Sequence, residues 1–287
     1  MSIIMSGKEV SANTRAKISD EVKAFKEERG ITPGLAVIIV GNNEASKVYV
    51  RNKHKACEDV GMYSKVIEMP EETAEEELLS LIDSLNKDDE IHGILVQLPL
   101  PKHIDEQKVI NSISPKKDVD AFHPENVGKI MIGEYDFLPC TPAGVMEILA
   151  YYNIEISGKK CVIVGRSNIV GKPQALLLLE KNGTVTICHS RTKDLKEETK
   201  QADILVVAIG KPDFITADMV KEGAVVVDVG INRMPDGKLH GDVNFDEVAP
   251  KSYAITPVPG GVGPMTITML LKNTLTAAKK HLLIKNN

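Results

Sequence analysis

Apolar residues along this chain gather into short continuous runs, and longer amphipathic segments separate these runs. The main apolar runs lie at 35–41, 91–98, 161–165, 203–210 and 224–230. Runs of this length are typical of parallel strands covered on both faces, whereas segments such as 12–30 and 73–88 have the pattern of helices. This order predicts an α/β fold of two βα domains flanking a cleft, the second a Rossmann-like doubly wound parallel sheet.

An irregular stretch at 112–142 interrupts the alternation of strand and helix. We therefore place a domain boundary there. The prediction is a first domain of residues 1–142 plus 270–287 and a second domain of residues 143–269. In this prediction the last helix packs back on the first domain.

Composition narrows the class of protein. The 287 residues are 43% hydrophobic and 26% charged, with a net charge of −5 and no basic block, which is typical of a soluble protein that binds neither nucleic acid nor membrane. The apolar runs are shorter than the ~18 residues of a membrane span, and the first residues lack a secretion-signal pattern. Scattered cysteines and dispersed histidines predict a cytoplasmic protein without a bound metal.

One lysine lies where the helical pattern calls for an apolar side chain. At ~100° per residue, the predicted helix places Ala45, Tyr49, Ala56 and Val60 on a core-facing stripe. Lys53 falls in the same sector, one turn from Tyr49. It either extends its ammonium group to solvent along the edge of the stripe, or is a partly desolvated amine that exchanges protons near neutral pH.

Two further polar positions belong to the same predicted domain. Gln97 lies at the carboxyl end of a buried run, where α/β sheets bind ligands, although alone it is better explained as a structural amide. Asp118 and Asp120 alternate around Val119 and point the same way if the segment is extended, although a solvated turn is the simpler interpretation. Taken with Lys53, these residues predict a ligand site at the mouth of this domain.

The stretch "CVIVGRSNIVGKP" (161–173) has the outline of a phosphate-binding turn without its usual glycines. Gly165 fits the first position of G-x-G-x-x-G, but Ser167 and Val170 replace the second and third glycines. A strand-like run precedes the loop, and Pro173 suits the first turn of a helix. We interpret the loop as a variant phosphate site in which free N–H groups and the side chains of Arg166 and Ser167 form the cradle.

The end of the next strand distinguishes the two nicotinamide cofactors. An NAD site places an acidic residue there for the ribose 2′-hydroxyl, but this chain has Ser190 and Arg191. With Arg166, these groups suit a 2′-phosphate and favour NADP over NAD, the alternative being ordinary surface arginines. Gly210 and Gly230 end two further strands and permit close approach of the backbone to a ligand.

The stretch "TPVPGGVGPMT" (256–266) precedes the last helix and is rich in proline and glycine. It is either a stiff turn or a wall on which a flat ligand lies against the backbone. The N-terminus of the following helix is available to a carboxylate or phosphate.

Eight motifs, in order along the chain, resemble those of the bifunctional methylenetetrahydrofolate dehydrogenase/methenyltetrahydrofolate cyclohydrolase family. They are "ASKVYVRNK", "GILVQLPLP", "KDVDAFHPENVGK", "PCTPAGV", "GRSNIVGKP", "CHSRT", "VVVDVGIN" and "PVPGGVGPMT". The resemblance implies NADP-dependent oxidation of 5,10-methylenetetrahydrofolate to the 5,10-methenyl cation, and its hydrolysis to 10-formyltetrahydrofolate. It also implies a homodimer and a place in one-carbon metabolism and purine biosynthesis.

The resemblance further implies a role for each matching residue. Tyr49 would pack on the aminobenzoate ring of the folate, Lys53 would be the catalytic acid/base, Gln97 would hold and tune Lys53, and Asp120 would anchor the pterin. The expected NADP site comprises Gly165, Arg166, Ser167, Ser190, Arg191, Gly210 and Ile231, and the expected folate site comprises Tyr49, Asp120, Pro259, Gly260 and Gly261.

One position departs from the family pattern, because Ala121 stands where the family usually has the glycine of KDVDGF. Its methyl group narrows the approach of the backbone to the pterin. A monofunctional or NAD-linked dehydrogenase is the alternative enzyme, and a nucleotide-sensing scaffold is a non-enzymatic alternative. The combination of Lys53, Gln97 and Asp120 favours the bifunctional enzyme.

Overall fold

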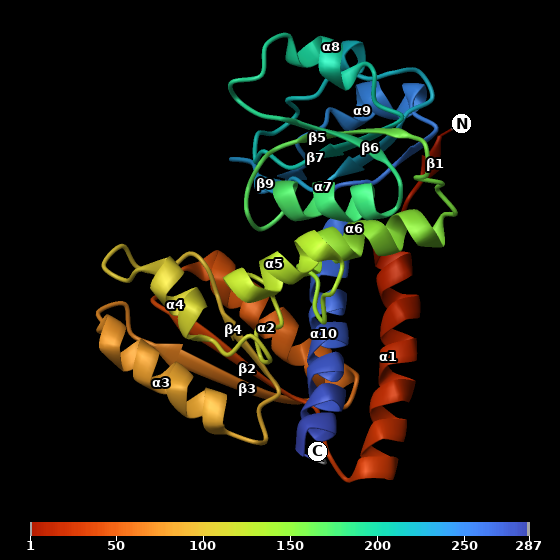
Figure 1. The fold of residues 1–287 in the computed structure, drawn as a ribbon. Coiled ribbons are helices and arrows are strands. Elements are labelled where there is room, and N and C mark those ends of the chain that lie inside the picture. Colours follow the sequence, from red (N-terminus) through yellow and green to blue (C-terminus); the bar gives the residue numbers. More distant parts are fainter. Residues whose placement is uncertain (1, 286–287) are drawn as a thin grey trace. The chain divides into compact units, whose positions relative to one another are not determined.

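The computed structural model describes residues 2–285, without the side chains of Ala45 and of residues 283–285. The chain divides into two compact units: unit 1 is Met1–Ala12 with Pro139–Thr266, and unit 2 is Asn13–Leu138 with Ile267–Asn287. Two long helices, α1 (Gly7–Arg29) and α10 (Val262–Lys285), begin in unit 1 and continue in unit 2 (Figure 1).

The first residues of the chain belong to unit 1, so the predicted first domain is wrong at its beginning. Strand β1 (Ile3–Ile4) pairs in parallel with β11 (Ala254–Ile255). The N–H of Met5 extends this pairing by donating to the carbonyl oxygen of Ile255 at 2.8 Å. The pairing joins opposite ends of the chain, and no local pattern at the N-terminus predicts such a partner.

Unit 2 is built on a sheet of three parallel strands in the order β3–β2–β4. Its strands are β2 (Gly34–Val40), β3 (Tyr63–Met69) and β4 (Gly93–Val96), and its helices include α2 (Glu44–Asp59), α3 (Glu75–Lys87), α4 (Glu106–Ser112) and α5 (Pro124–Ile132). Every residue of β2 is buried, as predicted for a strand covered on both faces. Ala36 and Ile38 of β2 pack with Leu78 and Ile82 of α3.

Unit 1 is built on a sheet of six parallel strands in the order β1–β11–β8–β7–β5–β6. The remaining strands of this sheet are β5 (Lys160–Val164), β6 (Thr184–Cys188), β7 (Ile204–Val207) and β8 (Val225–Asp228), and β9 (Asn232–Arg233) pairs separately with β10 (Leu239–His240). The helices include α6 (Cys140–Tyr151), α7 (Gly171–Glu180), α8 (Leu195–Thr199) and α9 (Phe245–Val248), with 3₁₀ turns at Ala217–Met219 and Ala249–Lys251.

Helices cover both faces of the unit 1 sheet. Helix α7 packs on β5 and β6, and α8 and α9 lie on the opposite side of the sheet (Figure 1). On that opposite side, Val162, Leu205 and Val226 of three neighbouring strands pack with Val248 of α9. The predicted α/β fold with parallel sheets is therefore confirmed.

The strand order of unit 1 locates the edge at which a ligand is expected. Numbered along the chain from β5, the strands β6–β5–β7–β8–β11 follow the order 2-1-3-4-5 of doubly wound sheets. The order reverses between β5 and β7, and open α/β sheets bind ligands beyond the carboxyl ends of the strands at such a point. The loops after β5 and β7 therefore lie where a cofactor is expected.

The cysteines behave as small buried hydrophobic residues. Cys57, Cys140, Cys161 and Cys188 are buried free thiols. Burial raises the pKa of Cys57 to about 12 and the pKa of Cys161 to about 11, so these two thiols are poor nucleophiles. Among residues 2–285, no three His, Cys, Asp or Glu side chains are grouped to hold a metal ion, and no described helix is long and apolar enough to cross a membrane.

Candidate active site

Lys53 of α2 and Gln97 after β4 are in direct contact within unit 2. The Nζ of Lys53 donates to Oε1 of Gln97 at 3.0 Å, and Nε2 of Gln97 donates to the carbonyl oxygen of Leu98 at 2.8 Å. The second hydrogen bond determines which end of the amide faces the lysine. Lys53 is only 8% exposed, so its side chain does not extend to solvent.

The buried side of α2 is centred on Lys53. Val50, Cys57 and Val60 are each at most 3% exposed and lie three, four and seven residues from Lys53, which is the spacing of one helical face. Tyr49 is 39% exposed, so the expectation that its ring faces the core is wrong. Helix α2 begins close after the end of β2, and its first turns therefore lie at the edge of the sheet. Ala45, which was expected on the same stripe, lies outside the described side chains.

Asp118 and Asp120 do not share one environment, because the segment forms a turn, as in the simpler interpretation, but Asp118 is buried in that turn and not solvated. Asp118 is 2% exposed and accepts hydrogen bonds from the N–H of His123 and from Nδ2 of Asn126, each at 2.8 Å. Burial raises the pKa of Asp118 above its ordinary value despite these donors. Asp120 is partly exposed. The segment turns here instead of extending, because the N–H of Ala121 bonds back to the carbonyl oxygen of Asp118.

The backbone at Ala121 explains why glycine suits this position. Ala121 has φ of 57° and is fully buried. A side chain in this left-handed conformation crowds the following carbonyl group, whereas glycine adopts the conformation freely. The methyl group of Ala121 therefore strains the turn that carries Asp120.

In unit 1, two glycines of the 161–173 stretch pack directly on each other. A Cβ atom on Gly171 would lie 2.3 Å from the carbonyl oxygen of Gly165, and a Cβ on Gly165 would lie 2.3 Å from the carbonyl oxygen of Ala208 after β7. Neither position accommodates a side chain without moving the backbone. The spacing of these glycines thus serves the close packing of the loop against α7 and β7.

Ser167 closes the start of α7. Its Oγ accepts hydrogen bonds from the N–H groups of Val170 at 3.1 Å and Gly171 at 3.3 Å. These two N–H groups are therefore already bound, and the expected cradle of free N–H groups does not include them. The hydroxyl of Ser167 therefore binds the backbone N–H groups of the residues at which α7 begins.

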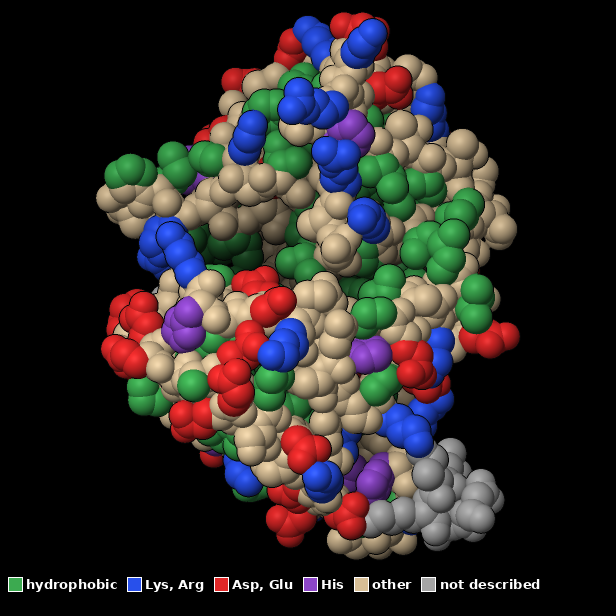
Figure 2. Space-filling model, turned by 60° about the vertical axis from the view of Figure 1, so that its left-hand side comes forward, with side chains coloured by type: hydrophobic (Ala, Val, Ile, Leu, Met, Phe, Trp, Pro, Cys, Tyr) green, Lys and Arg blue, Asp and Glu red, His purple; other side chains and the backbone are tan. Residues whose placement is uncertain are grey.

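Basic side chains are exposed on the two adjacent loops after β5 and β6. Arg166, Lys172, Arg191 and Lys193 are all exposed, as is Ser190, and Figure 2 shows several Lys and Arg side chains on the face of unit 1 that is in view. The turn after β6 is held by the N–H of Arg191, which donates to Nδ1 of His189 at 3.1 Å. Arg191 and Arg166 thus extend from the carboxyl ends of neighbouring strands.

A small pocket of about 160 Å³ at the same edge of unit 1 brings together Ile231 and the predicted residues Pro259, Gly260 and Gly261. The proline- and glycine-rich stretch packs tightly on the start of α1, where a Cβ on Gly7 would lie 1.8 Å from the carbonyl oxygen of Gly261. Gly210 is not packed in the way that Gly7 is. A Cβ on Gly210 would meet nothing within 4 Å, and only its φ of 66° favours glycine. Space for a ligand therefore lies beside Gly210.

Two buried carboxylates near the carboxyl ends of the unit 1 strands were not predicted from the sequence. Asp228, the last residue of β8, is 3% exposed, and Asp242 is fully buried. Burial raises the pKa of Asp228 to about 7, and the neighbouring carboxylate of Asp242 acts in the same direction. The signal for Asp228 in the sequence is its charge within the otherwise apolar run "VVVDVG".

Comparison with known proteins assigns both parts of the chain to one family. Residues 5–120 match the tetrahydrofolate dehydrogenase/cyclohydrolase catalytic domain, and residues 139–282 match the NAD(P)-binding domain of the same family. The chain belongs to the tetrahydrofolate dehydrogenase/cyclohydrolase family. It is therefore a bifunctional oxidoreductase and hydrolase of folate metabolism, which confirms the activity predicted from the sequence.

Members of this family resemble the chain over nearly its whole length. The bifunctional protein FolD of Moorella thermoacetica is 61% identical over 277 residues, which cover 96% of this chain and 99% of that protein. The FolD structure from Campylobacter jejuni has a TM-score of 0.96 at 52% identity and covers 98% of this chain and 100% of that one. The Trypanosoma brucei FolD, complexed with NADP and an inhibitor, has a TM-score of 0.94 at 39% identity and covers 98% of each chain.

The strain at Ala121 predicts that Ala121→Gly stabilises the protein. Left-handed backbone costs roughly 1–2 kcal/mol per non-glycine residue, and glycine loses about 0.5–1 kcal/mol more entropy on folding. The free energy of unfolding from urea titration should therefore rise by up to about 1 kcal/mol. In the control Ala278→Gly, at a fully buried position in helix α10, it should fall by at least about 0.5 kcal/mol. A lower stability of Ala121→Gly would contradict this account of the turn.

Proposed function

We propose that the chain oxidises 5,10-methylenetetrahydrofolate with NADP and hydrolyses the resulting 5,10-methenyl cation to 10-formyltetrahydrofolate, with Lys53 as the acid/base of the hydrolysis. The observation that carries this proposal is the hydrogen bond of the buried Lys53 amine to Gln97. A buried amine that donates to a neutral amide is suited to proton exchange. The product places the enzyme in one-carbon metabolism and the supply of formyl groups for purine biosynthesis.

Hydrolysis of the cation needs a group that moves protons twice. Water adds to the methenyl carbon and loses a proton, which gives a neutral carbinolamine. The carbon–nitrogen bond to the ring then breaks as that nitrogen gains a proton, and the hydroxyl proton leaves to solvent as the formyl C=O forms. Lys53 takes the first proton and supplies the second, while Gln97 keeps its Nζ in place at 3.0 Å. Lys53 accepts a proton in the first step and donates a proton in the second, so one amine serves both steps.

The remaining folate contacts are assigned to exposed or partly exposed groups. In unit 2, the ring of Tyr49, which is 39% exposed, packs on the aminobenzoate ring, and Asp120 anchors the pterin. In unit 1, Pro259, Gly260 and Gly261 remain the residues assigned to folate binding. The exposure of Tyr49 supports its role, because a stacking ring must be open to its ligand.

The residues of unit 1 fit NADP. Bound NADP would supply the hydride acceptor, and this chemistry requires alignment of the reacting atoms and no protein acid. Gly165, Ser167, Gly210 and Ile231 form the backbone surface that would receive it. The exposed Arg166, Ser190 and Arg191 would hold the 2′-phosphate, and this assignment is supported by the absence of an acidic residue from "HSRT" at the end of β6.

A homodimer in the cytoplasm belongs to the same proposal. Strand β6 lies at the edge of the unit 1 sheet, where Ile187 is 39% exposed and the nearby Leu179 of α7 is 58% exposed. An edge strand with exposed apolar side chains offers a surface for pairing with a second copy. Four buried free cysteines support a reducing compartment.

Replacing Lys53 tests the hydrolytic step. Lys53→Met retains the length of the buried side chain and removes the amine, so cyclohydrolase activity should fall by about 100-fold or more. The activity is measured as the loss of methenyltetrahydrofolate absorbance, after subtraction of spontaneous hydrolysis. Lys55→Met, an exposed position on the same helix, serves as the control and should hydrolyse at the wild-type rate. A wild-type rate in Lys53→Met would rule out the role assigned to this lysine.

Turnover of methylenetetrahydrofolate with each nicotinamide cofactor tests the dehydrogenase. The wild type should prefer NADP, and Arg191→Ala should raise KM for NADP by about tenfold while leaving KM for NAD nearly unchanged, because only NADP carries the 2′-phosphate. Lys181→Ala, at an exposed position after α7, is the control. Equal or better turnover with NAD would favour the NAD-linked alternative, and oxidation without hydrolysis would favour a monofunctional dehydrogenase.

Sedimentation velocity tests the dimer. The wild type should sediment with the mass of two chains, and Ile187→Lys should shift the protein toward the monomer because it places a charge on the edge strand. Ile132→Lys, at an exposed position of α5, should leave the mass unchanged. A monomeric wild type at micromolar concentration would rule out the homodimer.

A further inference from the structure

Two fully or nearly buried carboxylates at the carboxyl edge of the unit 1 sheet have no part in the proton transfers described above. Asp228 ends β8 and Asp242 follows β10 by one residue, and they are 3% and 0% exposed. Burial of a carboxylate is costly unless hydrogen-bond donors surround it. The identity of those donors shows what the two side chains hold in place.

Asp228 binds backbone on both sides of β9 and β10. Its Oδ1 accepts from the N–H groups of Gly230 and Asp242, and its Oδ2 accepts from the N–H of Val243, each at 2.9 Å. The N–H of Asp228 itself donates to Oγ1 of the buried Thr256 at 2.8 Å. Asp228 therefore connects the loop after β8 to the beginning of the proline- and glycine-rich stretch.

Asp242 binds the loop after β7. Its Oδ2 accepts from the N–H groups of Ile209 at 2.6 Å and Gly210 at 3.0 Å, and its Oδ1 accepts from the N–H of Lys211 at 2.8 Å. The same Oδ1 accepts from Nδ2 of Asn232 at 2.9 Å. Each oxygen of Asp242 thus receives two hydrogen bonds, and three consecutive N–H groups turn inward to one carboxylate.

Two glycines allow the backbone to approach these carboxylates. A Cβ on Gly230 would lie 2.2 Å from Oδ1 of Asp242, and a Cβ on Gly241 would lie 1.8 Å from Oδ2 of Asp228. Each carboxylate oxygen occupies the space that a side chain would need. The loops and the two carboxylates therefore form one close-packed unit.

The inward N–H groups determine what the loop after β7 offers to a ligand. In a trans peptide the N–H and the preceding C=O point in opposite directions, so the carbonyl oxygens of Ala208, Ile209 and Gly210 point away from Asp242. The carbonyl oxygen of Ala208 faces Gly165 of the phosphate loop. Beside Gly210, this edge therefore presents hydrogen-bond acceptors, which suit the hydroxyl and amide N–H groups of a nucleotide cofactor.

We propose that Asp228 and Asp242 are positioning residues for the nicotinamide cofactor, holding the loops of Gly210 and Ile231 in the conformation that receives NADP. The inference rests on the proposed function of unit 1. The carboxylates are buried and act through the backbone N–H groups of these loops, which they hold by hydrogen bonds. They accept seven hydrogen bonds between them, three at Asp228 and four at Asp242.

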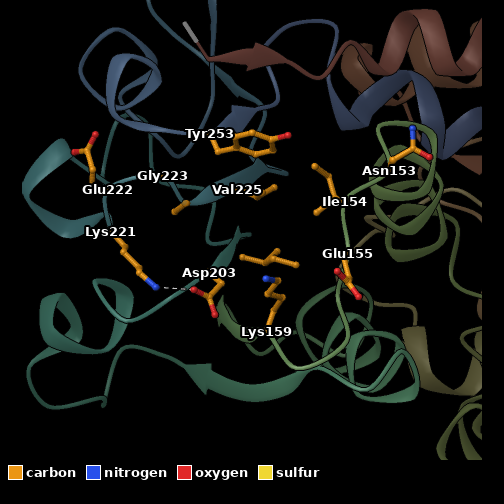
Figure 3. Close-up of a pocket in the computed structure, with 12 residues that line it drawn as sticks. Asn153, Ile154, Glu155, Lys159, Asp203, Lys221, Glu222, Gly223, Val225 and Tyr253 are labelled. Carbon is orange, nitrogen blue, oxygen red and sulfur yellow. Dashed lines mark hydrogen bonds and ion pairs between the residues drawn. The ribbon is translucent and has the colours of Figure 1, made fainter.

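Asp203 is a matched control for Asp228 and Asp242, because it is a hydrogen-bonded carboxylate at the amino ends of the strands in the same sheet. It immediately precedes β7, accepts from the N–H of Lys160 at 2.8 Å, and pairs with Nζ of Lys221 at 2.6 Å. Figure 3 shows this pair in a pocket of about 330 Å³ that contains none of the predicted site residues. Asp203 thus also joins segments of unit 1, but at the amino ends of the strands, away from Gly210 and Ile231.

Substitution of Asp242 by asparagine tests the proposal. An amide in this place turns its –NH₂ group toward two N–H donors, whichever way it is oriented. We expect Asp242→Asn to raise the Kd for NADP, measured by isothermal titration calorimetry, and KM for NADP by about tenfold or more. With NADP saturating, kcat should change by less than about twofold, because the interaction acts on cofactor binding.

Asp203→Asn is the control and should leave the Kd for NADP within about twofold of wild type. Cyclohydrolase activity, measured on methenyltetrahydrofolate without cofactor, should also remain within about twofold in both variants, because its proton-transfer residues, Lys53 and Gln97, belong to unit 2. A parallel loss of NADP affinity and cyclohydrolase activity would indicate general damage to the fold and would overturn the proposal. A folded Asp242→Asn that binds NADP as tightly as wild type would overturn it as well.

Asn232→Ala keeps the proposal testable if Asp242→Asn does not fold. This change removes one of the four donors to Asp242 and should raise the Kd for NADP about threefold, and an unchanged Kd would then overturn the proposal. Wild-type binding of NADP tests the proposed function separately. If the wild type binds no NADP, both fail, whereas equal binding by wild type and variants refutes the positioning role alone.

Discussion

Parallel strands that enter a sheet in the same direction all end at one edge, and the candidate residues of each unit depend on this constraint. Gln97 follows β4 in unit 2, and Gly165, Ser190, Gly210 and Ile231 follow β5, β6, β7 and β8 in unit 1. Helices or a 3₁₀ turn separate these positions along the chain. The common direction of the strands brings each set to one edge, where loops are free to vary because the sheet is already covered on both faces.

The cost of burying polar groups determines the local geometry at that edge. Lys53 is buried in the centre of one face of α2, and its hydrogen bond to Gln97 orients both side chains. Asp228 and Asp242 are buried, and they accept hydrogen bonds from six backbone N–H groups and from the side chain of Asn232. A buried polar group is stable only when hydrogen-bond partners surround it. The hydrogen bonds that stabilise the fold here therefore also fix the orientation of these side chains.

Much of this site was predictable where one residue contradicted its local pattern. Lys53 within an apolar sector and Gln97 at the end of a buried run were recognised in this way, and the structure places them in contact. Asp228 contradicts the run "VVVDVG" as clearly, but its role depends on Asp242 and the loop after β7. The burial of Asp118 and the exposure of Tyr49 were not predictable, because both depend on which other elements cover them.

By itself, the sequence determined the alternation of buried strands and helices, the family to which the chain belongs, and the residue types available for proton transfer and phosphate binding. These follow from local periodicity and from motifs, which act over a few residues. Only the tertiary structure decided that β1 joins unit 1, that Gly171 packs on Gly165, and that two carboxylates hold the loop of Gly210. Such contacts join residues that are distant along the chain, and the free energy of each depends on partners that only folding brings within reach.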